Sequence, residues 1–167
     1  RVAIVTGAGG GLGRQLALAP APRGARVPLN DLGGAVDGTG GSDSAAQRVV
    51  DEIRAAGGEA LPNFGSVTDF AAVQAMVQQC LDAWGRIDVL VNNAGILRDK
   101  TFAKMDLTDF RQVLDVHLMG AVHLCKAAWP QMVARQYGRI VLTTSSSGLY
   151  GNFGQSNYGA AKMALVG

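Results

Sequence analysis

The chain has 167 residues, of which 48% are hydrophobic and 17% are charged, below the roughly 25% charged residues of an ordinary domain. This balance argues against intrinsic disorder, and a net charge of +2 without a dense Lys/Arg cluster argues against binding nucleic acid or a membrane surface. No apolar run reaches the roughly 20 residues of a transmembrane helix, and no signal peptide is visible. The spacing of Cys80, Cys125 and the two histidines matches no zinc motif, and the cysteines are interpreted as reduced thiols of an intracellular protein.

Apolar runs and helical periodicity alternate along the chain. Five apolar runs predict strands, at 2–5, 25–31, 59–64, 87–91 and 139–145. Helical spacing predicts helices between them, at 12–19, 44–56, 66–85, 108–135 and from 156. Pro62 puts the third strand at a sheet edge, and Pro28 weakens the prediction of the second strand, because proline removes a ladder donor. Residues 66–69 have the spacing of a capping box that opens the third helix.

Continuously apolar strands that alternate with helices predict one α/β domain over residues 1–167, with a doubly wound parallel sheet. Arg1 leads directly into a strand, and the chain stops soon after its last helix begins. The chain is therefore expected to be a fragment.

A glycine-rich stretch predicts a dinucleotide site. Residues 6–13 (Thr-Gly-Ala-Gly-Gly-Gly-Leu-Gly) follow the first strand and open a helix, where backbone N–H groups and small residues suit a pyrophosphate. Asp31 ends the second strand 18 residues after Gly13, close to the roughly 20 expected for a carboxylate that binds the adenosine ribose. Because Asp31 repels a 2′-phosphate, the predicted cofactor is NAD; Arg14 keeps NADP as the alternative. Residues 92–95 (Asn-Asn-Ala-Gly), at another strand end, favour contact with the nicotinamide riboside or form an ordinary turn.

Tyr158 and Lys162 form the chain's single Tyr-x-x-x-Lys pair. Residues four apart share a helix face, and a nearby ammonium stabilises a phenolate, which suits general acid–base work on an alcohol or ketone. A chance surface pair is the alternative. Ser145, at the end of the fifth predicted strand, is a candidate to hold the substrate oxygen, in competition with Thr143, Thr144, Ser146 and Ser147.

Together these motifs resemble the classical short-chain dehydrogenases/reductases over essentially the whole chain. The resemblance implies a Rossmann fold that is C-terminally incomplete here, without the family's last strands and substrate-covering segment. It also selects Ser145, thirteen residues before Tyr158, as the catalytic serine. It assigns general acid–base catalysis to Tyr158 and the nicotinamide ribose to Lys162. The implied cofactor-binding residues are Gly7, Gly11, Leu12, Gly13, Asp31, Ser66, Val67, Asn93, Gly95, Tyr158 and Lys162. His117 stands where classical members carry Asn, and we expect a packed histidine with a structural hydrogen bond.

Residues 30–34, 93–99 and 148–155 further resemble the (3R)-hydroxyacyl-CoA dehydrogenase regions of type 2 peroxisomal multifunctional enzymes and their bacterial relatives. This resemblance implies oxidation of a (3R)-3-hydroxyacyl-CoA to a 3-oxoacyl-CoA in fatty acid β-oxidation. It also implies a homodimer or other homo-oligomer, located in peroxisomes in a eukaryote or in the cytoplasm in a bacterium. The alternatives are a reductase of another ketone class, such as a 3-oxoacyl carrier or a steroid, and a nucleotide-binding fragment without activity.

Overall fold

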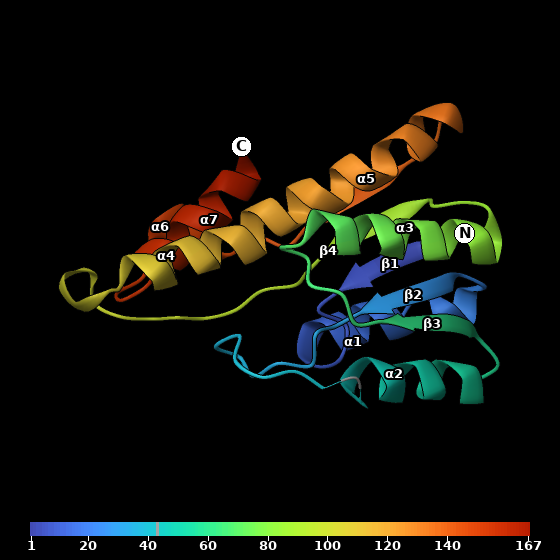
Figure 1. Ribbon diagram of the computed structural model, residues 1–167, viewed down its shortest axis with the longest axis horizontal. Helices are drawn as coiled ribbons and strands as arrows, with labels where there is room; N and C mark the ends of the chain where they lie inside the picture. The colour runs from blue at the N-terminus through green and yellow to red at the C-terminus, as the bar shows by residue number, and fades with distance from the viewer. Residues whose placement is uncertain (43) are drawn as a thin grey trace.

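The computed structural model describes residues 1–42 and 44–167 and contains one parallel sheet (Figure 1). Its strands are β1 (Ala3–Thr6), β2 (Arg26–Asn30), β3 (Glu59–Asn63), β4 (Val89–Asn92) and β5 (Arg139–Leu142). They lie in the order β3-β2-β1-β4-β5, and each neighbouring pair is parallel. Because the strand order reverses between β1 and β4, the predicted doubly wound Rossmann topology is confirmed.

Helices cover both faces of the sheet (Figure 1). One face carries α1 (Gly11–Leu18) and α2 (Ser44–Ala55), and the other carries α3 (Phe70–Trp84) and α5 (Gly120–Ala134). The remaining helices pack together beside one end of the sheet: α4 (Leu107–Leu114), α6 (Ser146–Tyr150) and α7 (Ser156–Val166). Two short 3₁₀ turns, η1 (Ala21–Arg23) and η2 (Phe102–Lys104), complete the connections.

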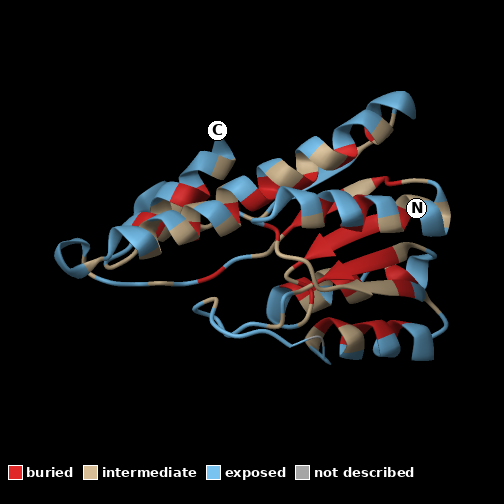
Figure 2. Ribbon diagram, in the orientation of Figure 1, coloured by how far each residue is buried: buried red, intermediate tan, exposed pale blue. Residues whose placement is uncertain are grey.

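Strand β1 shows why the sheet needs two helical layers. Successive side chains of a strand point to opposite faces, so Ile4 packs with α3 and α5 while Val5 packs with α1 and α2. Both side chains are fully buried, and β1 is coloured as buried along its length in Figure 2. Burial of such a side chain stabilises the folded state by about 1.5–3 kcal/mol. The alternating side chains of the central strands therefore hold both helical layers against the sheet.

The two prolines of the sheet lie in different kinds of strand. Pro62 lies in β3, which is an edge strand as predicted. Pro28 lies in β2, between β1 and β3, so the predicted second strand forms although it contains a proline. Val27 and Leu29 on either side of Pro28 are fully buried, and burial of both neighbours outweighs the hydrogen bond that proline cannot donate.

The start of α3 differs from its prediction. Asp69 is the N-cap, and its carboxylate accepts hydrogen bonds from the N–H groups of Ala71 (2.9 Å) and Ala72 (3.3 Å). Ser66 instead accepts a bond from the N–H of Thr68 at 3.3 Å. The predicted capping box at 66–69 is therefore wrong, because an ionised carboxylate closer to the apolar stripe satisfies the free N–H groups better.

The long helix predicted at 108–135 consists of three parts. Helix α4 is followed by a π-helical segment, η3 (Asp115–Met119), and then by α5. A π segment accommodates an extra residue in its turn and is frequent at functional sites. His117 lies within this segment.

Candidate active site

The glycine-rich stretch forms an open cradle at the start of α1. A Cβ on Gly13 would lie 1.9 Å from the carbonyl oxygen of Gly7, so this tight turn requires glycine. A Cβ on Gly10 or Gly11 would meet nothing within 4 Å, which leaves that side of the cradle free for a ligand. Gly10 is the N-cap of α1 and provides no side-chain cap, so the first N–H groups of the helix remain available to an anion.

A cleft of about 740 Å³ opens from this cradle. Its size falls within the roughly 300–1,000 Å³ typical of cofactor and ligand sites. Four segments provide its walls, namely residues 7–11, 30–38, 65–68 and 93–96. Because these segments follow β1, β2, β3 and β4, the cleft lies at the carboxyl ends of the strands, where parallel sheets bind their ligands. The residues present therefore fit a dinucleotide.

Asp31 holds two glycine-rich loops together at this edge. Its Oδ2 accepts a hydrogen bond from the N–H of Gly9 at 2.7 Å, and its Oδ1 accepts one from the N–H of Gly33 at 2.6 Å. Each carboxylate oxygen keeps a second lone pair, so the carboxylate can still accept a ribose hydroxyl. Asp31 therefore organises the adenosine end of the cleft as well as giving it negative charge.

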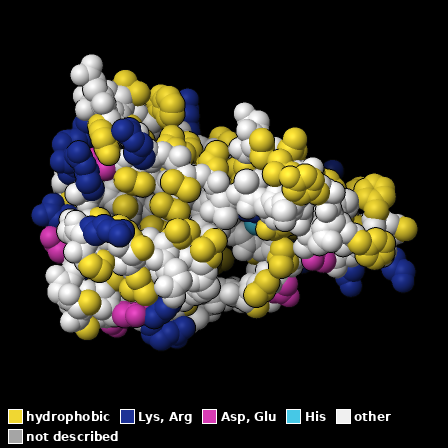
Figure 3. Space-filling model, turned by 180° about the vertical axis from the view of Figure 1, so that it is seen from behind, with side chains coloured by type: hydrophobic (Ala, Val, Ile, Leu, Met, Phe, Trp, Pro, Cys, Tyr) yellow, Lys and Arg dark blue, Asp and Glu magenta, His cyan; other side chains and the backbone are white. Residues whose placement is uncertain are grey.

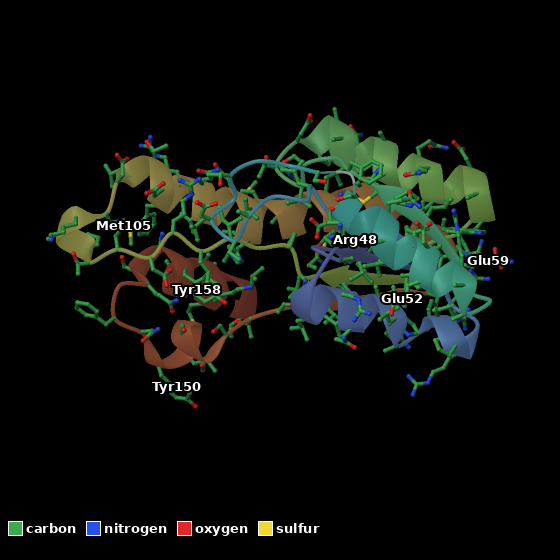
Figure 4. The ribbon with its side chains drawn as sticks, turned by 90° about the horizontal axis from the view of Figure 1, so that it is seen from below. Arg48, Glu52, Glu59, Met105, Tyr150 and Tyr158 are labelled. Carbon is green, nitrogen blue, oxygen red and sulfur yellow. The ribbon has the colours of Figure 1, made fainter. Side chains whose placement is uncertain are left out.

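Two arginines near this end have different surroundings. Arg14 forms a bidentate pair with Glu52, through Nε–Oε2 at 3.1 Å and Nη2–Oε1 at 2.5 Å. Arg48 lines the cleft and donates to Ser44 Oγ at 3.1 Å. Both Arg48 and Glu52 project from α2 (Figure 4). Glu52 thus pairs with Arg14, the cation that the sequence suggests for the 2′-phosphate of NADP. Arg48 is not indicated as a site residue by the sequence.

Thr6 anchors the segment that follows β4. Its Oγ1 accepts hydrogen bonds from the N–H groups of Asn93 and Ala94, both at 3.1 Å. The side chain of Asn93 donates in return to the carbonyl oxygens of Thr6 and Gly7, both at 3.2 Å. Asn93 therefore joins two walls of the cleft. A single sequence carries no signal for the part played by Thr6 beyond its place at the end of a strand.

Lys162 and Tyr158 lie on the same side of α7, as their spacing predicts. The Lys162 ammonium is 5.6 Å from the centre of the Tyr158 ring and donates to the carbonyl oxygen of Thr143 at 2.5 Å. Lys162 is only 3% exposed, and burial lowers its pKa to about 8. Figure 4 shows Tyr158 on the inner side of α7, whereas Tyr150 points into solvent.

His117 packs against Tyr158 and the backbone of Ile96. Its Nε2 lies 3.0 Å from the N–H nitrogen and 2.9 Å from the carbonyl oxygen of Ile96, and its ring meets that of Tyr158 edge-on at 5.2 Å. This is the structural hydrogen bond expected for a packed histidine. Burial lowers the pKa of His117 to about 4, against the opposing effect of the Ile96 backbone, and Lys162 lowers it further. A Cβ on Gly95 would lie 2.3 Å from Cε1 of this ring, so His117 also explains that glycine.

Ser145 occupies a different element from the one predicted. Strand β5 ends at Leu142, so the expectation that Ser145 ends this strand is wrong. Ser145 is the N-cap of α6, and its Oγ accepts a hydrogen bond from the N–H of Ser147 at 3.2 Å. The chain leaves the sheet because Thr144 Oγ1 donates to the carbonyl oxygen of Lys162 at 2.7 Å and thereby ties this stretch to α7.

The cleft and the Tyr158 region are adjacent but distinct. Among the residues placed by sequence, the cleft is lined by Gly7, Gly11, Asp31, Ser66, Val67, Asn93 and Gly95. Its walls, as far as the structure describes them, do not include Leu12, Gly13, Ser145, Tyr158 or Lys162. Ile96 connects the two parts, because it lines the cleft and packs with Tyr158 in one apolar cluster.

Two other kinds of site are absent from residues 1–42 and 44–167. These residues contain no group of three or more His, Cys, Asp or Glu side chains arranged to hold a metal ion. None of the helices described there is long and apolar enough to cross a membrane.

The comparison with known proteins decides the family. The family model for short chain dehydrogenases matches residues 1–167. The chain belongs to the short-chain dehydrogenase family. This family consists of oxidoreductases that use NAD(P).

Individual relatives of this short-chain dehydrogenase are similar over its whole length. It is 54% identical over 167 residues to the peroxisomal hydratase-dehydrogenase-epimerase of Saccharomyces cerevisiae and 56% identical over 167 residues to the peroxisomal multifunctional enzyme type 2 of Drosophila melanogaster. A crystal structure of a short chain dehydrogenase from Mycobacterium avium superposes with a TM-score of 0.87 at 46% identity, covering 99% of this chain. The chain spans 18%, 27% and 59% of those three proteins, respectively.

Proposed function

We propose that this short-chain dehydrogenase interconverts a secondary alcohol and a ketone with NAD, and that its substrate is a (3R)-3-hydroxyacyl-CoA. The observation that carries the proposal is the position of Tyr158. Its ring packs with Ile96, which also lines the dinucleotide cleft, and the Lys162 ammonium lies 5.6 Å from the ring centre. An acid–base group and a cofactor site on neighbouring walls are what alcohol oxidation requires.

The chain's own residues supply position and proton transfer. The Lys162 ammonium stabilises the phenolate form of Tyr158, and this phenolate removes the hydroxyl proton of the substrate and becomes a neutral phenol. Ser145 holds the substrate oxygen through its hydroxyl group. When bound, NAD supplies the hydride acceptor. The Gly10–Gly11 edge of the cradle holds the pyrophosphate, and Asp31 holds the adenosine ribose.

The charges at the adenosine end support NAD over NADP. Asp31 lines the cleft, and a carboxylate repels a 2′-phosphate. Arg14 is engaged by both carboxylate oxygens of Glu52. Arg48 lines the cleft and is the cation of this wall that could pair with a 2′-phosphate. Activity is therefore to be measured with both NAD and NADP.

Two observations support an acyl-CoA substrate. The yeast and fly proteins that resemble this chain are named as peroxisomal enzymes, and the yeast name includes a dehydrogenase. The end of the molecule that carries η2 and α6 exposes large apolar side chains next to lysines, as Figure 3 shows at its right-hand side. Phe102, Tyr150 and Phe153 are 75%, 86% and 87% exposed, and Lys100 and Lys104 are exposed beside Phe102. Apolar and cationic groups together suit an acyl-CoA, because its acyl chain is apolar and its CoA part carries phosphates.

Assembly and location form the remaining part of the proposal. We expect a homodimer or larger homo-oligomer built on α5 and α7, whose outer sides expose Val122, Trp129, Val133, Met163 and Val166. The location is peroxisomal in a eukaryote and cytoplasmic in a bacterium, in line with the peroxisomal names of the yeast and fly relatives.

Replacement of Tyr158 by Phe tests the proposal in the full-length protein. The variant is expected to lose at least about a hundredfold in kcat, because general acid–base catalysis contributes roughly 10²–10⁴-fold. NAD affinity, measured by titration calorimetry, should stay within a factor of two to three, because the cradle is untouched. Tyr137→Phe is the matched control, because Tyr137 lies just before β5, at the end of that strand away from the cleft, and its ring stacks with Arg1 and Arg139.

The wild-type assay uses 3-hydroxyacyl-CoA esters of several chain lengths with NAD and with NADP. Preference for NADPH and a non-CoA ketone would replace the proposed substrate by another reductase substrate. Cofactor binding without turnover of any alcohol would leave a nucleotide-binding module. Equal loss of activity and NAD binding in Tyr158→Phe would refute the role assigned to Tyr158.

A further inference from the structure

The segment 33–42, which follows β2, is a compact loop in the wall of the cleft. Its base is closed by a hydrogen bond from the N–H of Ser42 to the carbonyl oxygen of Leu32 at 3.1 Å, and its tip by one from the N–H of Ala35 to the carbonyl oxygen of Thr39 at 2.8 Å. Gly33 has a φ of +69°, and a Cβ there would lie 1.9 Å from the oxygen of Ser42. Residues 32–36 line the cleft. The loop is therefore a defined wall of the cofactor site.

This loop contacts the opposite wall of the cleft. The N–H of Leu97, in the segment after β4, donates to the carbonyl oxygen of Val36 at 2.9 Å. The side chain of Ile96 fills the space beside Gly38, where a Cβ would meet it at 3.0 Å. Because Ile96 also lines the cleft, these contacts close one end of the space in which a dinucleotide would lie.

The guanidinium of Arg98 fixes the loop to helix α4. Its Nε donates to the carbonyl oxygen of Asp37 at 2.9 Å, and its Nη1 pairs with Oδ1 of Asp109 at 2.6 Å. The side chains of Arg98 and Asp109 are only 22% and 26% exposed. A planar guanidinium can make both bonds at once in a fixed geometry, which a lysine ammonium cannot reproduce.

The backbone of Arg98 fixes a second element, the start of α7. Its carbonyl oxygen accepts a hydrogen bond from Nδ2 of Asn157 at 2.9 Å, and Asn157 is fully buried. Oδ1 of Asn157 accepts in turn from the N–H of Tyr158 at 2.8 Å. One residue thus contacts the cofactor loop through its side chain and the Tyr158 helix through its carbonyl group.

We propose that Arg98 is a positioning residue that clasps the 33–42 loop over the dinucleotide and holds it in register with the helix that carries Tyr158. The consequence for the enzyme rests on the proposed function. Arg98 contacts neither cofactor nor substrate in this role; it acts by keeping the wall of the cleft closed. Loss of its side chain opens the loop and speeds cofactor release, while the bond from its carbonyl group to Asn157 remains.

The first test measures amide hydrogen exchange in the full-length protein without cofactor. Arg98→Ala is expected to accelerate exchange of residues 33–42 several-fold, and Arg98→Lys to a smaller extent. Arg26→Ala is the matched control, because Arg26 pairs with Glu59 at 3.0 Å at the start of β2, the opposite end of the strand from the loop. Unchanged exchange in the loop, or equal acceleration throughout the protein, would overturn the clasp.

The second test measures NAD dissociation and steady-state kinetics. Loss of a charge-assisted bond and its ion pair is expected to raise the NAD dissociation rate and KM by about three- to tenfold in Arg98→Ala, with kcat changed by less than about twofold. A fall in kcat with an unchanged KM would contradict the clasp. Wild-type protein that binds no NAD while Arg98→Ala still frees the loop would refute the proposed function and leave the clasp intact.

Discussion

At the residue scale, His117 shows how burial changes the chemistry of a side chain. It is 4% exposed, and within the described residues its Nδ1 has no hydrogen-bond partner. Desolvation lowers its pKa from 6.5 to about 4, so the imidazole is neutral at physiological pH. A neutral ring can keep its bond to Ile96 and pack against Tyr158 without adding a second positive charge beside Lys162.

This neutral state predicts a pH dependence of stability. The unfolded state binds the histidine proton below about pH 6.5 and the folded state only below about pH 4, so folding loses stability as the pH falls through this window. The loss attributable to His117 is on the order of 2–3 kcal/mol. Urea unfolding at pH 7 and pH 4 is expected to show a smaller decrease for His117→Gln than for the wild type. Equal decreases for both proteins would show that His117 does not titrate in this range.

Single residues also mark what the sequence could not reveal. Tyr158, Lys162 and Asp31 stand out in the sequence because their spacing relates directly to the strand and helix periods. Asp69 is predicted inside a capping box instead of at the N-cap, because its part depends on the exact start of the helix. Thr6 and Arg98 receive no role of their own, since each acts through backbone groups that are distant in sequence. Hydrogen bonds to backbone leave no compositional pattern in one sequence.

At the element scale, substitutions in the turn from β1 into α1 can distinguish an effect on folding from an effect on cofactor binding. Gly13 has no room for a side chain, because a Cβ would lie 1.9 Å from the oxygen of Gly7. Gly10 has an extended backbone, with a φ of −165°, and a Cβ at this position would meet nothing within 4 Å. The two glycines therefore serve different purposes in the same loop.

Alanine substitutions at these two positions should behave differently. Gly13→Ala is expected to lower the free energy of unfolding by about 2 kcal/mol or more through overpacking, measured by urea denaturation. Gly10→Ala should leave this free energy within about 0.5 kcal/mol but weaken NAD binding, because its methyl group enters the cleft. Wild-type stability in Gly13→Ala would contradict the close approach of the two loops.

Element existence was more predictable than element ends. Apolar runs located all five strands of the described sheet. Strands β1, β2 and β4 are largely buried, and a strand buried on both faces must be apolar throughout, whereas β5 is apolar in sequence but exposed. The predicted end of β5 is Ser145 instead of Leu142 because residues 143–145 look compatible with a strand. The hydrogen bonds of Thr143 and Thr144 to Lys162 of α7 draw this stretch away from the sheet. The apolar periodicity of residues 108–135 does not indicate the π-helical segment.

At the scale of the whole molecule, the outer sides of α5 and α7 are unusually apolar. Val122, Trp129 and Val133 on α5 are 45%, 56% and 58% exposed, and Met163 and Val166 on α7 are 49% and 51% exposed. Exposed apolar side chains gathered on two neighbouring helices are typical of subunit interfaces. This distribution is the physical support for the proposed homo-oligomer.

A charge introduced on α5 tests this assembly. Trp129→Lys is expected to shift the full-length protein towards monomer in sedimentation velocity experiments, because a buried unpaired ammonium opposes association. Phe153→Lys is the control, since Phe153 is 87% exposed on the α6–α7 loop and lies outside α5 and α7. A monomeric wild type, or an unchanged oligomer in Trp129→Lys, would exclude this interface.

The π-helical segment between α4 and α5 has a consequence for how the helical layers are coupled. Val113 packs against α7, whereas Leu124 belongs to the core beneath α3. On an uninterrupted α-helix these residues, separated by about three turns, would face nearly the same way. The wider turn at Asp115–Met119 changes the rotational phase of the second half, so one continuous helix serves two cores. The number of residues in that turn, more than their identity, therefore sets the direction in which α5 faces.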